Sequence, residues 1–262
     1  MHGGTEEKGT VVAVQQQFFM RGENMVTALI FAGGTGQRMN TRSKPKQFLE
    51  LHGKPVIVYT IEHFQYHPEV DNIVVVCLEN WIDELKGLLK KYGLSKVTKI
   101  VHGGETGHDS IYNGLKAMEG ESRADDIVLI HDGVRPLITE NLISQNIETV
   151  KKYGNAITVE AARESVLQST DGINVDVVPD RDMMYVAKAP QSFYYADIMK
   201  MYNKAKENGH RSIDSAHLLS MYNMPMHIIH SEKNNIKITE PADFYIFRAL
   251  YEAIENQQIM GI

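Results

Sequence analysis

The chain has 262 residues, of which 43% are hydrophobic and 23% charged, and its formal net charge is −6. This composition is ordinary for a soluble globular protein. The acidic balance argues against a broad nucleic-acid-binding surface, and no apolar run is long enough to span a membrane. The single cysteine, Cys77, cannot form an internal disulfide, which suits a reducing cytoplasm. Residues 1–25 have no secretory signal pattern, and we expect them to be a disordered extension.

The first predicted strand, residues 27–31, leads into a glycine-rich loop. Glycines let backbone N–H groups approach an anion closely, and successive N–H groups form an anion-binding concavity. Arg38 and Lys46 follow and supply the positive charge that a polyphosphate needs. The dinucleotide fingerprint fails at Met39, and no Walker A tripeptide follows. We therefore favour a nucleoside triphosphate loop over a glycine-rich turn with surface cations. Its candidate residues are Ala32, Gly33, Gly34, Thr35 and Gly36.

Apolar strand-like runs then alternate with helical patterns. This alternation predicts βαβ units in an α/β fold, with a Rossmann-like, mostly parallel sheet and helices on both faces. The strand runs are continuously apolar, as expected when both faces of the sheet are covered. The predicted strands are residues 27–31, 72–77, 99–102, 127–131 and 156–159. The predicted helices are residues 56–67, 81–92, 110–118 and 142–153.

A second glycine pair follows the strand predicted at residues 99–102. Ligands in such sheets bind beyond the carboxyl ends of the strands, so we expect this segment near the first glycine loop. Its backbone amides, including that of Gly104, and the Ser110 hydroxyl could bind a base or a ribose. The alternative is equally favoured: Asp109 or Ser110 has a structural role alone, as the cap of a helix that begins at Ile111.

Asp132 stands at the end of the strand predicted at residues 127–131. A carboxylate there can hold Mg²⁺ against nucleotide phosphates, because Mg²⁺ takes one or two protein carboxylates plus phosphate oxygens. Asp132 is therefore the candidate metal ligand, and the plainer alternative is a turn or helix-capping residue. Arg135 could face the ligand or hold the loop by a salt bridge.

The pattern changes after residue 161. Short extended pieces around a turn at residues 170–172 predict a β-arm, at about residues 162–185, that projects from the sheet. Arg181, near its end, could bind a second phosphate bidentately. From spacing alone, a solvated charge cluster is favoured there.

The helical pattern resumes near residues 196–208, and residues 241–255 predict a closing helix. Between them, Lys237 is predicted to lie in a short strand with Ile236 and Ile238. A lysine there either protects a sheet edge from pairing with another strand or points its charge into a cleft. The sequence alone favours protection of the edge.

Together these segments resemble the cytidylyltransferase family that includes the methylerythritol-phosphate and ribitol-5-phosphate cytidylyltransferases. The resemblance covers nearly the whole chain, so it implies a single nucleotidyltransferase domain at residues 26–256. The motifs that carry it are residues 32–39, 45–48, 103–104, 109–110, 131–136, 190–193 and 235–239, with Arg181.

The resemblance implies a role for each matching residue. The implied catalytic residues are Arg38, Lys46, Arg181 and Lys237. The implied nucleotide-binding residues are those of the glycine loop together with Gly104, Asp109, Ser110 and Gly133. The implied substrate-binding residues are Arg135, Ser165, Arg181 and Lys237. Asp132 would hold Mg²⁺. The resemblance also implies a homodimer whose arm reaches the partner's site.

The sequence thus predicts an enzyme that transfers CMP from CTP to a polyol phosphate and releases pyrophosphate. No covalent enzyme intermediate is needed, because the acceptor phosphate is already an anionic nucleophile. Residues 79–82, 181–185 and 190–193 are more similar to the ribitol-phosphate branch, so D-ribitol 5-phosphate is the expected acceptor and 2-C-methyl-D-erythritol 4-phosphate the alternative.

Two other functions stay open on the sequence alone. Gly107 stands where the family commonly has arginine, which would suit a nucleotide-binding regulatory protein that has lost turnover. The glycine-rich loop would also permit a sugar-1-phosphate nucleotidyltransferase that uses UTP or dTTP. The residues at 131–136 and 235–239 favour cytidylyl transfer by resemblance.

Overall fold

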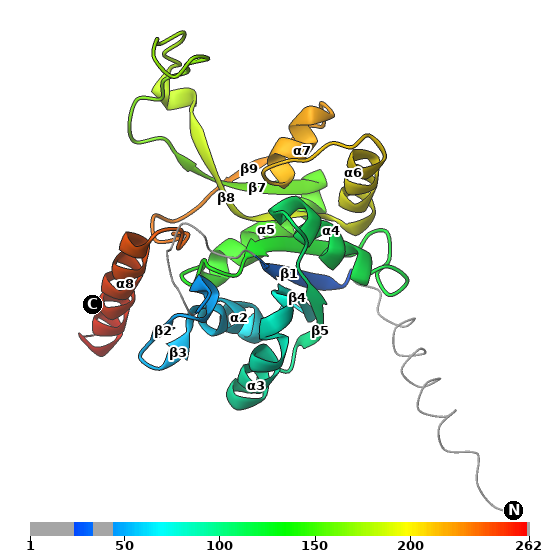
Figure 1. Ribbon diagram of the computed structural model, residues 1–262, viewed down its shortest axis with the longest axis vertical. Helices are drawn as coiled ribbons and strands as arrows, with labels where there is room; N and C mark the ends of the chain where they lie inside the picture. The colour runs from blue at the N-terminus through cyan, green and yellow to red at the C-terminus, as the bar shows by residue number, and fades with distance from the viewer. Residues whose placement is uncertain (1–23, 34–43, 261–262) are drawn as a thin grey trace, which may run out of the picture.

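Figure 1 shows the computed structural model, in which a central sheet lies between helices and an arm extends away from it. The structure describes residues 24–33 and 44–260. The expectation for the N-terminal extension therefore lies almost entirely outside the described residues. The same holds for four candidate site residues, which are Gly34, Thr35, Gly36 and Arg38.

The central sheet has seven strands in the order β5-β4-β1-β6-β8-β7-β9. Four of them, from β5 to β6, run parallel, so their carboxyl ends meet at one edge. Strand β8 is antiparallel to both of its neighbours, and β9 is parallel to β7. The expected α/β fold with a mostly parallel sheet is confirmed. The strands are β1 (Val26–Ala32), β4 (Asn72–Cys77), β5 (Val97–His102), β6 (Ile127–Asp132), β7 (Asn155–Ala161), β8 (Tyr185–Tyr194) and β9 (Ile228–His230).

Alternating side chains on the parallel strands build two hydrophobic layers. Ala28 and Ile30 of β1 pack in the layer with α2, α3 and α5, whereas Leu29 packs in the opposite layer with α4, α6 and α7. Helices therefore cover both faces, as expected. Those on the first face are α2 (Val56–Tyr66), α3 (Ile82–Tyr92) and α5 (Glu140–Tyr153). Those on the second are α4 (Gly107–Ala117), α6 (Tyr195–Glu207) and α7 (Ser215–Met221).

The last helix, α8 (Pro241–Met260), forms a third hydrophobic cluster beside the first layer. Phe247 of α8 packs edge-on against Tyr59 of α2, with ring centroids 5.5 Å apart. Ile238, just before α8, is fully buried in the same cluster. This packing carries the chain from the end of the sheet back across α2, and it places residues 235–238 beside the loop that follows β6.

The structure corrects two expectations about local structure. Lys237 does not lie in a strand: residues 236–238 form no ladder, and Ile238 N donates instead to Val134 O at 2.9 Å. Strand β8, the longest of the sheet, was not predicted as a strand, because buried polar residues such as Gln191 and Ser192 interrupt its apolar pattern.

The arm predicted after residue 161 is present and projects from the sheet between β7 and β8 (Figure 1). Its β-structure is limited to one bridge, between Gln168 and Val177. Asp171 makes the turn at its tip, accepting hydrogen bonds from the N–H groups of Ile173 and Asn174, each at 2.8 Å. Most arm side chains are exposed, so the arm has almost no core of its own in this chain.

Candidate active site

A cavity of about 460 Å³ opens at the carboxyl ends of the parallel strands. It brings together seven of the residues that the sequence singled out: Ala32, Gly33, Lys46, Gly104, Ser110, Asp132 and Lys237. These residues come from five separate stretches of the chain. The cavity is therefore lined by glycine backbone, two lysines and carboxylates that include Asp132. The glycine backbone and the lysines suit a phosphorylated ligand.

The two glycine segments are packed too closely for side chains. A Cβ on Gly33 would lie 2.9 Å from Ser110 Oγ and 3.1 Å from Gly103 Cα. A Cβ on Gly104 would lie 2.3 Å from Asp109 Cβ. Ser110 Oγ also accepts a hydrogen bond from Gly104 N at 3.0 Å. Ser110 thus holds Gly104 by a hydrogen bond and packs closely against Gly33 at the cavity wall.

Helix α4 begins three residues earlier than expected, because Thr106 is its N-cap. Thr106 Oγ1 accepts from Asp109 N, and Asp109 Oδ2 accepts from Thr106 N at 3.1 Å, which is a capping box. Asp109 therefore belongs to the cap as its third residue, and it does not cap a helix at Ile111. Ser110 lines the cavity, whereas Asp109 lies behind it.

Asp132, at the end of β6, is buried between two cations. Arg135 Nε donates to Asp132 Oδ2 at 2.8 Å, and Lys237 Nζ lies 2.6 Å from Asp132 Oδ1. Burial alone would raise the pKa of Asp132, but the adjacent Arg135 and Lys237 charges outweigh it and hold this pKa well below its usual value. Asp132 is therefore a permanent anion at neutral pH.

Arg135 is buried behind Asp132. The structure therefore favours a salt bridge that holds the loop over an arginine that faces the ligand. Besides Asp132, its Nη1 donates to Asn235 O at 3.0 Å. Asn235 Nδ2 in turn donates to Ala189 O of β8 at 2.7 Å. Asn235, which was quoted in a motif but given no role, is 2% exposed. The chain of bonds fastens the segment that carries Lys237 to β6 and β8.

Lys46 lines the cavity from the short 3₁₀-helix η2 (Lys46–Phe48). The next residue, Gln47, was quoted in a motif but given no role. It is buried, and its Nε2 donates to Ala32 O at 2.7 Å. Gln47 therefore ties the lysine-bearing turn to the end of β1. Its place in the motif at residues 45–48 was the only sequence signal for it.

Helix α2 holds the loop after β6 through polar side chains, and His67, which follows α2, holds the start of α5. Thr60 Oγ1 donates to Gly133 O at 3.2 Å, and His63 Nε2 donates to Pro136 O at 3.0 Å. His67 Nε2 donates to Glu140 O at 3.3 Å, while its Nδ1 accepts from Glu69 N. Burial lowers the pKa of both histidines, so both rings are neutral at pH 7.

We expect the free energy of unfolding to fall as the pH drops below about 6.5. A base whose pKa is lowered in the folded state binds protons preferentially when unfolded, so acid favours unfolding. Each such histidine contributes a slope of up to about 1.4 kcal/mol per pH unit below its unfolded pKa. Urea denaturation at pH 7.5, 6.5 and 5.5 measures this loss. His67→Gln should flatten the slope between pH 6.5 and 5.5, and an unchanged slope would contradict this account.

Arg181 and Ser165 are not brought to the cavity within one chain. Both lie in the exposed arm, and within the described part of the chain Arg181 Nη2 pairs with the neighbouring Asp182 alone, at 3.4 Å. Neither residue lines the cavity. Gly133 lies at its edge, where a Cβ would be 2.9 Å from Ala32 Cβ.

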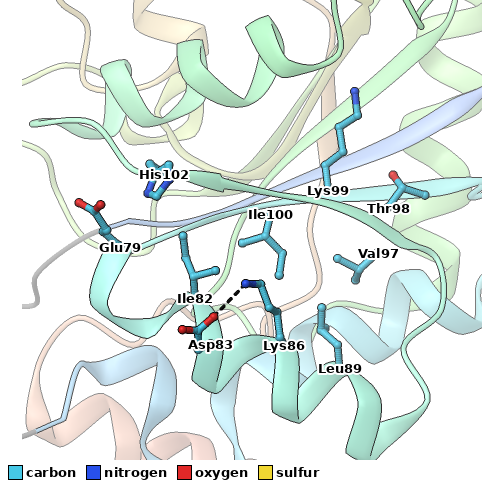
Figure 2. A pocket seen from close by; sticks show the side chains of 10 residues that line it. All are labelled: Glu79, Ile82, Asp83, Lys86, Leu89, Val97, Thr98, Lys99, Ile100 and His102. Atoms are coloured by element: carbon cyan, nitrogen blue, oxygen red, sulfur yellow. Dashed lines mark hydrogen bonds and ion pairs between the residues drawn. The ribbon is translucent and has the colours of Figure 1, made fainter.

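A larger groove, of about 670 Å³, lies between α3 and the edge strand β5 (Figure 2). Its floor is apolar, with Ile82 and Ile100. Both of its lysines are paired: Lys86 with Asp83 at 2.8 Å, and Lys99 with Glu121 at 2.8 Å. None of the described residues that line this groove is a glycine, whereas glycine backbone lines the cavity at the strand ends, so that cavity is the better phosphate site.

Within residues 24–33 and 44–260, no group of three or more His, Cys, Asp and Glu side chains could hold a metal ion alone. No helix in the described part of the chain is long and apolar enough to cross a bilayer.

Comparison with known proteins identifies the family. Residues 26–253 match the family described as IspD, 2-C-methyl-D-erythritol 4-phosphate cytidylyltransferase. The chain belongs to this family. It is therefore a cytidylyltransferase, and an enzyme, as the sequence predicted.

Curated relatives carry two names. The chain is 49% identical to a ribitol-5-phosphate cytidylyltransferase of Streptococcus agalactiae over 91% of this chain and 100% of that relative. It is 48% identical to a protein of the same name from Vibrio parahaemolyticus, over 90% and 100% of the two chains. A 2-C-methyl-D-erythritol 4-phosphate cytidylyltransferase of Clostridium botulinum is 35% identical, over 87% and 98%.

Solved structures confirm the fold. A 4-diphosphocytidyl-2C-methyl-D-erythritol synthase from Anaerococcus prevotii superposes with a TM-score of 0.76 at 30% identity, covering 87% of this chain and 96% of that one. The Francisella tularensis 2-C-methyl-D-erythritol 4-phosphate cytidylyltransferase gives 0.70 at 28% identity, covering 85% and 98%.

Proposed function

We propose that this enzyme transfers CMP from CTP to D-ribitol 5-phosphate, giving CDP-ribitol and pyrophosphate in the cytoplasm. The observation that carries the chemistry is the cavity that glycine backbone lines together with Lys46, Asp132 and Lys237. The acceptor assignment is supported by the higher identity to relatives named for ribitol 5-phosphate, 48–49% against 35% for a relative named for 2-C-methyl-D-erythritol 4-phosphate.

In this mechanism, an acceptor phosphate oxygen attacks the α-phosphorus of CTP in line, and pyrophosphate leaves. Catalysis consists of positioning and charge stabilisation. Lys46 offsets negative charge on the triphosphate and the leaving group, together with Arg38. Lys237 orients the acceptor phosphate next to Asp132, and the segment from Gly104 to Ser110 binds the nucleoside.

Mg²⁺ is the metal that we propose for this site, and the residues present fit it. Mg²⁺ is usually bound by one or two carboxylates plus substrate phosphates, and Asp132 supplies one permanent carboxylate at the cavity. Its Oδ1 is the oxygen that Lys237 approaches from the cavity side. When bound there, the metal would neutralise charge on the phosphate oxygens.

We also propose a homodimer in which the arm meets the partner's active site. The arm exposes apolar side chains that a monomer would leave in water, an indication of a protein interface. Ile173 is 86% exposed and Met183 67%. The others are Val166, Leu167, Val175, Val177 and Val178. An arm that crosses to the partner would bring Arg181 and Ser165 to a cavity that their own chain does not offer them.

Arg181→Ala should raise the KM for the acceptor and leave the KM for CTP unchanged, because a guanidinium pairs with a phosphate bidentately. Mixing Arg181→Ala with Asp132→Asn protein should restore part of the activity, since one hybrid site then carries both native residues. Steady-state kinetics before and after verified subunit exchange measure both effects. A changed CTP KM with an unchanged acceptor KM would refute the role of Arg181, and no recovery would refute the crossing arm.

Pyrophosphate release tests the proposed function directly. CTP, UTP, dTTP and ATP are each offered with ribitol 5-phosphate, 2-C-methyl-D-erythritol 4-phosphate or glycerol phosphate. We expect release with CTP and ribitol 5-phosphate at a kcat/KM at least tenfold above every other pair. Preference for 2-C-methyl-D-erythritol 4-phosphate would move the acceptor assignment to that alternative. Binding of CTP without turnover on any acceptor would contradict the proposed reaction.

A further inference from the structure

The segment between α6 and α7 reaches the nucleotide side of the cavity from a distant part of the sequence. Arg211 Nη2 lies 3.3 Å from Glu105 Oε2 and 3.8 Å from Asp109 Oδ2. Glu105 lines the cavity, and Asp109 belongs to the capping box of α4. The Arg211 guanidinium therefore connects the cavity-lining carboxylate of Glu105 with the turn at which α4 begins.

This segment is anchored on both sides of Arg211. Ser212 Oγ donates to His108 Nδ1 at 2.9 Å, and both residues are more than nine-tenths buried. Burial lowers the pKa of His108, so its ring stays a neutral acceptor at pH 7. On the other side, His210 N donates to Ala205 O of α6 at 2.8 Å, and further along the segment Gln191 Nε2 of β8 donates to Asp214 Oδ2 at 3.2 Å. Arg211 thus projects from a fixed support.

Gly107 leaves space next to the guanidinium. Arg211 contacts residues on either side of Gly107, which itself lines the cavity. A Cβ on Gly107 would meet no atom of residues 24–33 or 44–260 within 4 Å. The cavity wall is therefore open at this turn, and a ligand can approach the carboxylate that Arg211 holds.

We propose that Arg211 is a positioning residue for the nucleoside part of CTP, an inference that rests on the proposed function. It acts through Glu105, whose carboxylate it fixes at the cavity wall, and through Asp109, which keeps the cap of α4 in place. A fixed carboxylate accepts hydrogen bonds from nucleoside donors. Two donors have this chemistry in CTP: the ribose hydroxyls and the cytosine amino group.

Binding and turnover of Arg211→Ala test this role. We expect the Kd and KM for CTP to rise about three- to fivefold, the upper part of the range for an exposed ion pair acting on one ligand. The kcat and the acceptor KM should stay within about twofold, because Lys46, Asp132 and Lys237 are untouched. Arg211→Lys should recover part of the affinity. The matched control is Arg248→Ala, which removes an exposed arginine–glutamate pair on α8.

Calorimetric titration with CTP, dCTP and UTP separates the two donors. The CTP-over-dCTP preference should shrink in Arg211→Ala if Glu105 accepts from the ribose, and the CTP-over-UTP preference should shrink if it accepts from the cytosine amine. Arg211→Ala in a Glu105→Gln background should lose less CTP affinity than Arg211→Ala alone, because the contact with the Glu105 carboxylate is already absent.

Three results would overturn the inference: CTP affinity equal to that of Arg248→Ala, an equal loss for all three nucleotides, or additive losses in the double variant. These outcomes are distinct from failure of the proposed function. If the wild-type protein binds CTP but turns over no acceptor, the proposed reaction fails while the titrations still decide the role of Arg211. If the wild-type protein binds no CTP, both fail.

Discussion

Arg135→Met should lower the free energy of unfolding by about 3–5 kcal/mol, the usual cost of removing one partner from a buried ion pair. The side chains of Arg135 and Asp132 are 7% and 8% exposed, and their contact is 2.8 Å. Without the guanidinium, Asp132 keeps the half-exposed Lys237 as its one counter-charge among the described residues, and Asn235 O loses its donor. Urea denaturation measures the change.

Arg248→Met is the matched control, because it removes an exposed pair on α8 that is worth at most about 1 kcal/mol. Asp132→Asn combined with Arg135→Met should cost less than Arg135→Met alone, since the uncompensated charge is then absent. If Arg135→Met proves no more destabilising than the control, Arg135 does not stabilise Asp132 in the way the geometry indicates.

Lys46→Ala should lower kcat by about 10²–10³, equivalent to roughly 2.7–4 kcal/mol if Lys46 acts like one preorganised donor to the developing charge. The fold should be retained, because Lys46 is only half-buried and lies at the cavity wall. Steady-state kinetics with saturating CTP and acceptor measure the effect, and circular dichroism with thermal unfolding checks the fold.

Lys44→Ala is the control for Lys46. It lies two residues away, pairs with Glu50 on the surface, and does not line the cavity. Its kcat should stay within about twofold of the wild type, since exposed pairs contribute little. A Lys46→Ala enzyme with normal kcat and normal CTP saturation would show that Lys46 is a surface charge without a catalytic role.

Much of the fold followed from local patterns. The strand predicted at residues 72–77 is β4, and the helix predicted at 56–67 differs from α2 by one residue. Continuous apolar runs and helical periodicity are local signals, so they predict strands and helices without knowledge of the tertiary structure. The strand β8 was missed for the opposite reason: its buried Gln191 and Ser192 are satisfied by partners elsewhere in the chain, Asp214 and Asn146.

The candidate site divides in the same way. Motif spacing pointed to the glycine segments, Lys46, Asp132 and Lys237, and the structure brings these residues to one cavity. The strand predicted at residues 236–238 was wrong, because an alternating apolar pattern does not by itself establish a strand. Ile236 and Ile238 alternate with polar residues, but their backbone N–H groups donate to Asn234 and Val134 and form no ladder. Hydrogen-bond partners distant in sequence leave no local signal.

The sequence by itself determined the alternating α/β order, the family and the residue types that a phosphate-binding site needs, because hydrophobic periodicity and glycine-rich loops are encoded residue by residue. Only the tertiary structure decided which charges act together. It buried Arg135 behind Asp132, set Lys237 on the opposite oxygen, kept Arg181 away from its own cavity and placed Arg211 against Glu105. Charge pairing depends on distance in space, and folding alone fixes that distance.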